Sequence, residues 1–300
     1  MKQFYLAEIT TSDNLIHQGL FFQPSHKASA DKVNRALLWT HGLTDTFYGD
    51  KKLYEAFTDE AEKTGIAFAV FNNRGHDVVT SITKVDPKSA KGTSSFWGGA
   101  AYENFEESVF DIDAGISFLA AQGYSQIFIA GSSTGANKVC YYAGTQKDPR
   151  VIGVILASPL SDVAINKHYL GKKYHDQLQK MRALSKTKEA NKLLDDVDYF
   201  PLTPNRYLSL YTENSAEDTF PYYQKKPSFT LLKKITLPLL LIVGESDEYT
   251  DRPIDQIVGI FNKQQTSKSF KSVVIPQAFH SLKPQEKRAT KEIFSWISSL

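Results

Sequence analysis

Residues 131–135 read Gly131-Ser132-Ser133-Thr134-Gly135 and lie between a short apolar run at 127–130 and an amphipathic segment. The sequence therefore predicts a strand that turns sharply into a helix. Such a turn brings two backbone segments close together, and glycine on either side of it removes the Cβ atoms that would collide. Ser133, at the apex, would be held in a strained turn with its hydroxyl group exposed above the edge of the sheet. This arrangement suits a nucleophile.

Similar apolar runs recur along the chain and alternate with segments of helical periodicity. Each run is short and apolar on both faces, which is typical of strands in a parallel sheet that helices cover on both sides. The predicted strands are 36–40, 66–71, 127–130, 151–157, 239–243 and 270–275, preceded by a hairpin of 3–10 and 15–23. Alternating strands and helices with right-handed crossovers predict an α/β fold with a doubly wound, mostly parallel sheet.

Two stretches interrupt this alternation. Residues 78–101 are polar and rich in Gly and Ser, and we expect a long loop there that is functional or mobile. Residues 161–234 are far too long for one crossover and contain an amphipathic helix and an aromatic- and proline-rich part. We therefore expect a core domain formed by 1–160 and 235–300, with a helical cap at 161–234 inserted after the strand at 151–157.

The composition narrows the range of partners. The 300 residues carry a net charge of +2 and their lysines and arginines are dispersed, so no electrostatic feature favours nucleic acid or an anionic membrane. No apolar stretch approaches the ~20 residues that span a bilayer. Residues 1–5 lack the apolar segment of a signal peptide, and the single cysteine, Cys140, cannot form an internal disulfide. We therefore expect a cytoplasmic protein.

A serine hydroxyl becomes a strong nucleophile only when a base removes its proton and a carboxylate orients that base. His280 follows the last predicted strand, and Asp247 follows the strand before it. Because the carboxyl ends of parallel strands meet at one edge of the sheet, Ser133, Asp247 and His280 should converge there. Asp162, which comes just past the preceding strand, is the alternative acid.

Acyl transfer also needs an oxyanion hole, because its tetrahedral intermediate carries negative charge on oxygen. The backbone N–H of Thr134, at the start of the helix that follows Ser133, is one candidate donor. The other is the N–H of Leu43, in the loop after the predicted strand at 36–40, where Gly42 allows the backbone to approach closely.

Taken together, these features resemble the α/β-hydrolase superfamily. The matching positions, in the family's order, are His41-Gly42, Asn73-Arg74-Gly75-His76, the pentapeptide at 131–135, Gly244-x-x-Asp247 and His280. The match runs from about residue 33 to residue 300. Ser132 departs from the pattern, because many members have His there, but that side chain is not part of the triad. A weaker similarity, through Ser133-Thr134-Gly135 and Gly99-x-x-Tyr102-Glu103, is to esterase-like members that include fungal siderophore esterases.

The resemblance implies a serine hydrolase that cleaves esters, thioesters or amides through an acyl-enzyme. We expect a carboxylesterase that acts on a small to medium ester or lactone. A thioesterase or acyltransferase, or a C–C hydrolase or lyase, would use the same residues, and a non-catalytic ligand-binding relative would keep only the fold. No cofactor is expected, because the chain has neither G-x-G-x-x-G after its first parallel strand nor G-x4-G-K-[ST]. No metal site is expected, since His17, His26, His168 and His175 lack ligand spacing with Asp, Glu or Cys.

Overall fold

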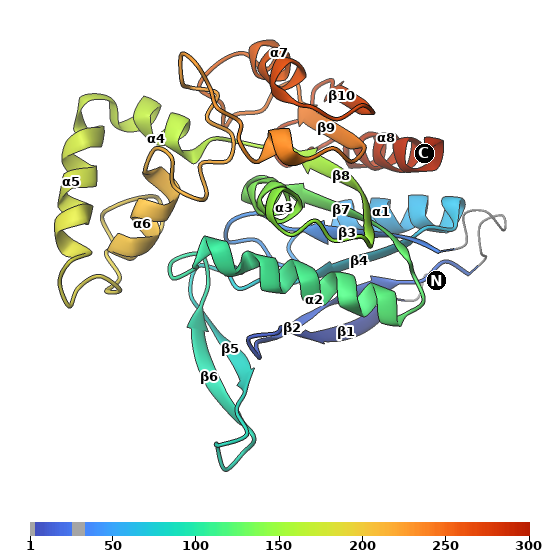
Figure 1. Ribbon diagram of the computed structural model, residues 1–300, viewed down its shortest axis with the longest axis horizontal. Coiled ribbons are helices and arrows are strands. Elements are labelled where there is room, and N and C mark those ends of the chain that lie inside the picture. The colour runs from blue at the N-terminus through green and yellow to red at the C-terminus, as the bar shows by residue number, and fades with distance from the viewer. Residues whose placement is uncertain (1–3, 26–33) are drawn as a thin grey trace.

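A computed structural model describes residues 4–25 and 34–300 of the protein (Figure 1). Residues 1–3 and 26–33, which include the first residue of the strand predicted at 3–10, lie outside the described part. The central element is an eight-stranded sheet in the order β1-β2-β4-β3-β7-β8-β9-β10. Its strands are β1 (Tyr5–Thr10), β2 (Ile16–Phe22), β3 (Arg35–Thr40), β4 (Ala67–Phe71), β7 (Gln126–Ser132), β8 (Val151–Ala157), β9 (Leu239–Gly244) and β10 (Phe270–Ile275).

The sheet is mixed, with its antiparallel part at one end. β1 pairs with β2 and β2 pairs with β4 in antiparallel fashion, whereas the pairs from β4 to β10 are parallel. Every residue of β4 and of β9 is buried, as expected for apolar strands covered on both faces. The predicted α/β fold with a doubly wound, mostly parallel sheet is therefore confirmed.

Helices cover both faces of this sheet. They are α1 (Lys51–Thr64), α2 (Ser108–Ala121), α3 (Thr134–Thr145), α7 (Ile254–Gln264) and α8 (Glu286–Ser299). On one face, α1 and α8 contribute Phe57 and Phe294 to a cluster with Phe68 of β4. On the other face, α2, α3 and α7 bury side chains such as Val139 and Phe261 against the opposite side of the strands. The carboxyl ends of the parallel strands are thus held at one edge by two independent apolar layers.

The expectation of an irregular loop at 78–101 is wrong. This stretch contains an antiparallel hairpin of β5 (Thr80–Val85) and β6 (Thr93–Gly98), which projects from the body of the molecule in Figure 1. The hairpin buries Ile82, whereas Trp97 is 66% exposed. Since so few of its residues enter the core, the segment lacks the apolar alternation by which a strand is normally detected.

Between β8 and β9 the chain forms three further helices, which Figure 1 shows gathered on one side of the sheet. They are α4 (Asp162–Leu170), α5 (Tyr174–Leu184) and α6 (Pro204–Tyr211). The amphipathic helix expected in this region is α5, which buries Tyr174, Leu178 and Met181 in a small cluster with residues of α6. Among the residues that the structure describes, no helix combines the length and the apolar character needed to cross a membrane.

Candidate active site

The turn at 131–135 has the geometry that its sequence predicts. β7 ends at Ser132 and α3 starts at Thr134, while Ser133 between them has φ 57° and ψ −130°. A Cβ on Gly131 would lie 2.1 Å from the carbonyl oxygen of Gly135, and one on Gly135 would lie 2.3 Å from that of Thr40. Both glycines are therefore required by backbone contacts, and Ser133 stands in a strained conformation at the end of the sheet.

His280 and Asp247 lie together at the same edge. They follow the neighbouring parallel strands β10 and β9, and Nδ1 of His280 is 2.9 Å from each carboxylate oxygen of Asp247. With its Nδ1–H directed at this carboxylate, the neutral ring has its lone pair on Nε2. The ring of Tyr249 packs against the imidazole, with the two ring centroids 5.0 Å apart. The backbone of His280 is held as well, because its N–H donates to the carboxylate of Glu248 at 2.9 Å.

The expected contact between Ser133 and His280 is not formed in the structure. Nε2 of His280 is buried and has no hydrogen-bond partner within the described part of the chain, so Oγ of Ser133 is not bonded to it. In unliganded enzymes such contacts are often long and tighten when substrate is bound. Nε2 of His280 is therefore free to accept a proton.

Asp162, the alternative acid, occupies different surroundings. It is the first residue of α4, and its Oδ2 is buried without a hydrogen-bond partner among the described residues. Burial and the negative charge of Glu217 raise the pKa of Asp162 well above its usual value, although Arg206 opposes this shift. Asp247 is the carboxylate that contacts the imidazole of His280, so the geometry favours Asp247.

The two amides expected to form the oxyanion hole are both available. Thr134 is the first residue of α3, and neither its N–H nor that of Leu43 donates a hydrogen bond within the described residues. A Cβ built on Gly42 would lie 2.9 Å from Cβ and 3.4 Å from Oγ of Ser133. The backbone before Leu43 thus packs directly against the Ser133 side chain.

His41 shapes this loop from below. It is fully buried, its Nδ1–H donates to the carbonyl oxygen of Gly42 at 3.0 Å, and its Nε2 accepts from the backbone N–H of Asn73 at 3.2 Å. Burial and the nearby charge of Lys138 lower the pKa of His41 from 6.5 to about 3. A ring that donates from Nδ1 and accepts at Nε2 must be neutral, so the lowered pKa and the contacts agree.

Arg74 fixes the loop after β4 through carboxylates. Its guanidinium contacts Asp111 at 2.9 Å, and it also pairs with Asp13 and Glu107. Burial alone would raise the pKa of Asp111, but the charges of Arg74 and His17 lower it well below its usual value. This group of charges holds the loop against α2.

A set of buried charges near the site was not anticipated from the sequence. Lys138 of α3 pairs with Glu103, and Arg206 of α6 pairs with both Glu103 and Glu217. All four side chains are fully buried. The sequence signal for Lys138 is that it stands directly before the apolar residues Val139 and Cys140 in a predicted helix.

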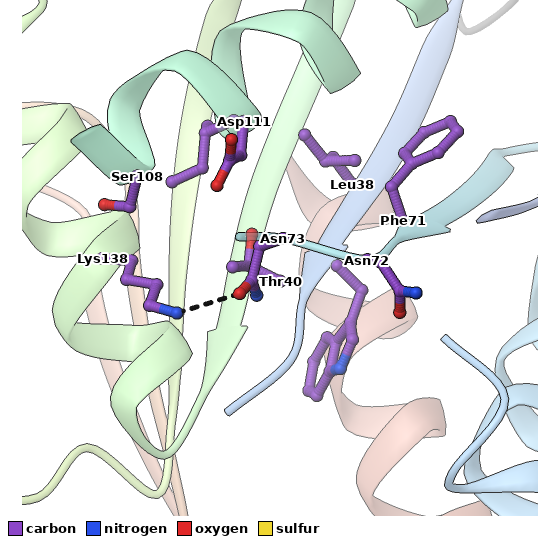
Figure 2. A pocket seen from close by; sticks show the side chains of 10 residues that line it. Leu38, Thr40, Phe71, Asn72, Asn73, Ser108, Asp111 and Lys138 are labelled. Atoms are coloured by element: carbon purple, nitrogen blue, oxygen red, sulfur yellow. Dashed lines mark hydrogen bonds between the residues drawn. The ribbon is translucent and has the colours of Figure 1, made fainter. Parts of the chain in front are cut away.

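Figure 2 shows a cavity behind this region, with Lys138 reaching toward Asn73 and with Ser108 and Asp111 of α2 beside them. Its volume is about 20 Å³, far below the roughly 300 Å³ at which small-molecule sites begin. The cavity is therefore too small for a substrate. In the part of the chain that the structure describes, no group of three or more His, Cys, Asp or Glu side chains could hold a metal ion.

Solved structures share this architecture at low sequence identity. An esterase of Pyrococcus furiosus is 15% identical, with a TM-score of 0.60 over 99% of this chain and 91% of that one. Est1E of Butyrivibrio proteoclasticus with bound ferulic acid is 18% identical, with a TM-score of 0.63 over 98% of each chain. DcsB in complex with its substrate analogue is 14% identical, with a TM-score of 0.67 over 99% of each chain. The chain has the α/β-hydrolase fold.

No curated protein sequence matches the chain. A protein-family model described as "protein of unknown function (DUF1749)" matches residues 82–300. This match includes Ser133, Asp247 and His280 but not Leu43. Because it covers more than half of the chain, the protein belongs to the DUF1749 family.

Proposed function

We propose that this protein is a serine hydrolase, and specifically a carboxylesterase that cleaves a small to medium ester or lactone. Ser133 attacks the carbonyl carbon while Nε2 of His280 takes the proton from its hydroxyl group. Asp247 holds the ring in the required tautomer and stabilises the imidazolium that forms. The N–H groups of Leu43 and Thr134 bind the oxyanion.

The observation that carries the proposal is the paired contact of His280 Nδ1 with Asp247, which leaves Nε2 unoccupied at the edge where Ser133 is strained. After attack, His280 gives its proton to the leaving alcohol, which departs and leaves an acyl group on Ser133. Water, deprotonated by His280, then attacks the acyl carbon and restores the free hydroxyl group.

We further propose that residues 161–234 form a cap over a core built from 1–160 and 235–300. α4 begins five residues after the end of β8, at the edge where the site lies. A cap in this position would exclude bulk water from the acyl-enzyme and select the substrate. Most of a small cluster of buried aromatic and aliphatic side chains lies within this segment, and Ala100, Leu43 and Val78 of the other part of the chain pack against it.

Labelling with a fluorophosphonate, together with hydrolysis of short and long p-nitrophenyl esters, tests the proposal. We expect one adduct on Ser133 and ester turnover that Ser133→Ala abolishes. An adduct without ester turnover would indicate a thioester, amide or C–C substrate handled by the same residues. If neither adduct nor turnover is found, the chain is a non-catalytic relative and the proposal is wrong.

A further inference from the structure

A continuous series of buried polar contacts connects α6 with the loop that carries Leu43. Arg206 Nη2 lies 3.0 Å from Glu103 Oε2, and Glu103 Oε1 lies 2.5 Å from Lys138 Nζ. Lys138 Nζ donates to Asn73 Oδ1 at 3.1 Å, and the Asn73 N–H donates to His41 Nε2 at 3.2 Å. The five residues come from five separate segments, so the contacts exist only in the folded chain.

The inner end of this series determines the direction of one amide. Asn73 Nδ2 donates to the carbonyl oxygen of His41 at 3.3 Å, and His41 Nδ1–H donates to the carbonyl oxygen of Gly42 at 3.0 Å. That carbonyl belongs to the same planar peptide as the Leu43 N–H, and the two groups of a trans peptide point in opposite directions. A fixed Gly42 carbonyl therefore fixes where the Leu43 N–H points.

The outer end reaches the segment between β8 and β9. Arg206 bonds both carboxylate oxygens of Glu217, and its Nε–H donates to the carbonyl oxygen of Ala100 at 3.0 Å. The ammonium group of Lys138, in the middle, makes its polar contacts with Glu103 and Asn73. Burying such charges costs several kcal/mol per ion, and replacing a whole buried ion-pair network by well-packed apolar side chains is often neutral or stabilising. Folding alone therefore does not account for them.

We propose that Lys138 is a positioning residue. Through Asn73 and His41 it holds the Leu43 N–H in the direction that an oxyanion requires, and through Glu103 and Arg206 it ties that direction to the proposed cap. The role of Leu43 in this inference rests on the function proposed above, whereas the mechanical connection does not.

The test distinguishes an effect on catalysis from an effect on stability by removing both charges of the Lys138–Glu103 pair together. Lys138→Met alone leaves Glu103 buried without its cation, and we expect it to destabilise the fold. Lys138→Met with Glu103→Gln leaves no unpaired charge, and the amide oxygen of the new glutamine remains an acceptor for Arg206. We expect this double variant to recover most of its resistance to denaturant while kcat for p-nitrophenyl acetate stays about 10- to 100-fold low and KM changes less than about threefold.

Arg150→Met is the matched control, because it removes a guanidinium that pairs with Asp113 and Asp148 away from the site. Its kcat should equal that of the wild type. A double variant with wild-type kcat would overturn the inference, since Lys138 would then serve stability alone.

Amide hydrogen exchange gives a readout that does not depend on turnover. In the double variant, amides at 41–46 should exchange at least about tenfold faster, while those of α8 keep their wild-type rates. If the wild type hydrolyses no ester and Ser133→Ala changes nothing, the proposed function fails, but faster exchange at 41–46 still supports the connection. Unchanged exchange at 41–46 overturns the connection, whatever the activity.

Discussion

The carboxylate that orients His280 can be identified by comparing two single substitutions. Asp247→Asn replaces the carboxylate that contacts Nδ1 with an amide, which favours the wrong tautomer of the ring. We expect kcat for p-nitrophenyl esters to fall by about 10³- to 10⁴-fold, with unchanged folding by circular dichroism. Asp162→Asn, which changes a carboxyl group that makes no contact with His280, should lower kcat less than about tenfold. A large loss in Asp162→Asn alone would transfer the role to that residue.

The lowered pKa of His41 predicts a pH dependence of stability. The folded protein holds this ring neutral down to about pH 3, whereas the unfolded chain binds a proton below about pH 6.5. Between these values the unfolded state binds more protons, so acidification favours unfolding. The stabilising contribution is complete above pH 6.5 and falls by up to about 1.4 kcal/mol per pH unit toward pH 3.

Urea unfolding at several pH values measures this slope. In His41→Asn the titrating ring is gone, and the free energy of unfolding should depend less steeply on pH between about 4 and 6 than in the wild type. The absolute stability of the variant is not the criterion, because Asn also loses the contact to Gly42. Parallel pH slopes in the two proteins would contradict the prediction.

At the level of elements, the turn between β7 and α3 depends on two glycines. In Gly131→Ala the new methyl group would meet the carbonyl oxygen of Gly135 at 2.1 Å, and backbone atoms cannot move aside as a flexible side chain can. We expect a loss of about 3 kcal/mol in the free energy of unfolding. The displaced turn should also abolish fluorophosphonate labelling of Ser133.

Gly259, in the interior of α7, provides the matched control. A Cβ built there meets nothing within 4 Å, and Ala has the higher helix propensity. Gly259→Ala should therefore stabilise the protein by roughly 0.5–1 kcal/mol without affecting labelling. If the two substitutions change the free energy of unfolding equally, the close backbone contact at Gly131 does not determine the stability of the turn.

For the molecule as a whole, Arg206 joins the 161–234 segment to the preceding part of the chain through Glu103 and the carbonyl oxygen of Ala100, and it pairs with Glu217 within the segment. Arg206→Met leaves Glu217 buried without a counter-charge, which should cost about 3–5 kcal/mol in the free energy of unfolding. Because the lost contacts join two parts of the chain, chymotrypsin should cut earlier at Tyr169 and Tyr199, which are 84% and 76% exposed.

Arg182→Met on α5 is the matched control, because it removes an exposed cation that makes no ion pair within the described residues. Chymotrypsin should cleave this variant at the same rate as the wild type. Mass spectrometry of the early fragments identifies the cut sites. If Arg206→Met were cut first within the sheet, the segment would not be anchored by these charges.

The parts of the fold that were predictable are those set by short-range pattern. Runs such as 239–243 are apolar on both faces because helices cover both faces of the sheet, and the periodicity of α5 follows from one buried side. The hairpin of β5 and β6 was missed because it buries little more than Ile82. A strand with few core residues leaves no periodic trace in the sequence.

The sequence by itself determined the strand, turn and helix around Ser133, because the apolar run before it, the amphipathic segment after it and the glycines at 131 and 135 together allow the close backbone crossing that this turn needs. It also determined the order Ser133, Asp247, His280 along the chain. Only the tertiary structure decided that Asp247 rather than Asp162 contacts His280, and that Lys138 joins Glu103 to Asn73. The physical reason is distance along the chain: these partners are 33 to 65 residues apart, and their contacts form only when separate elements pack together.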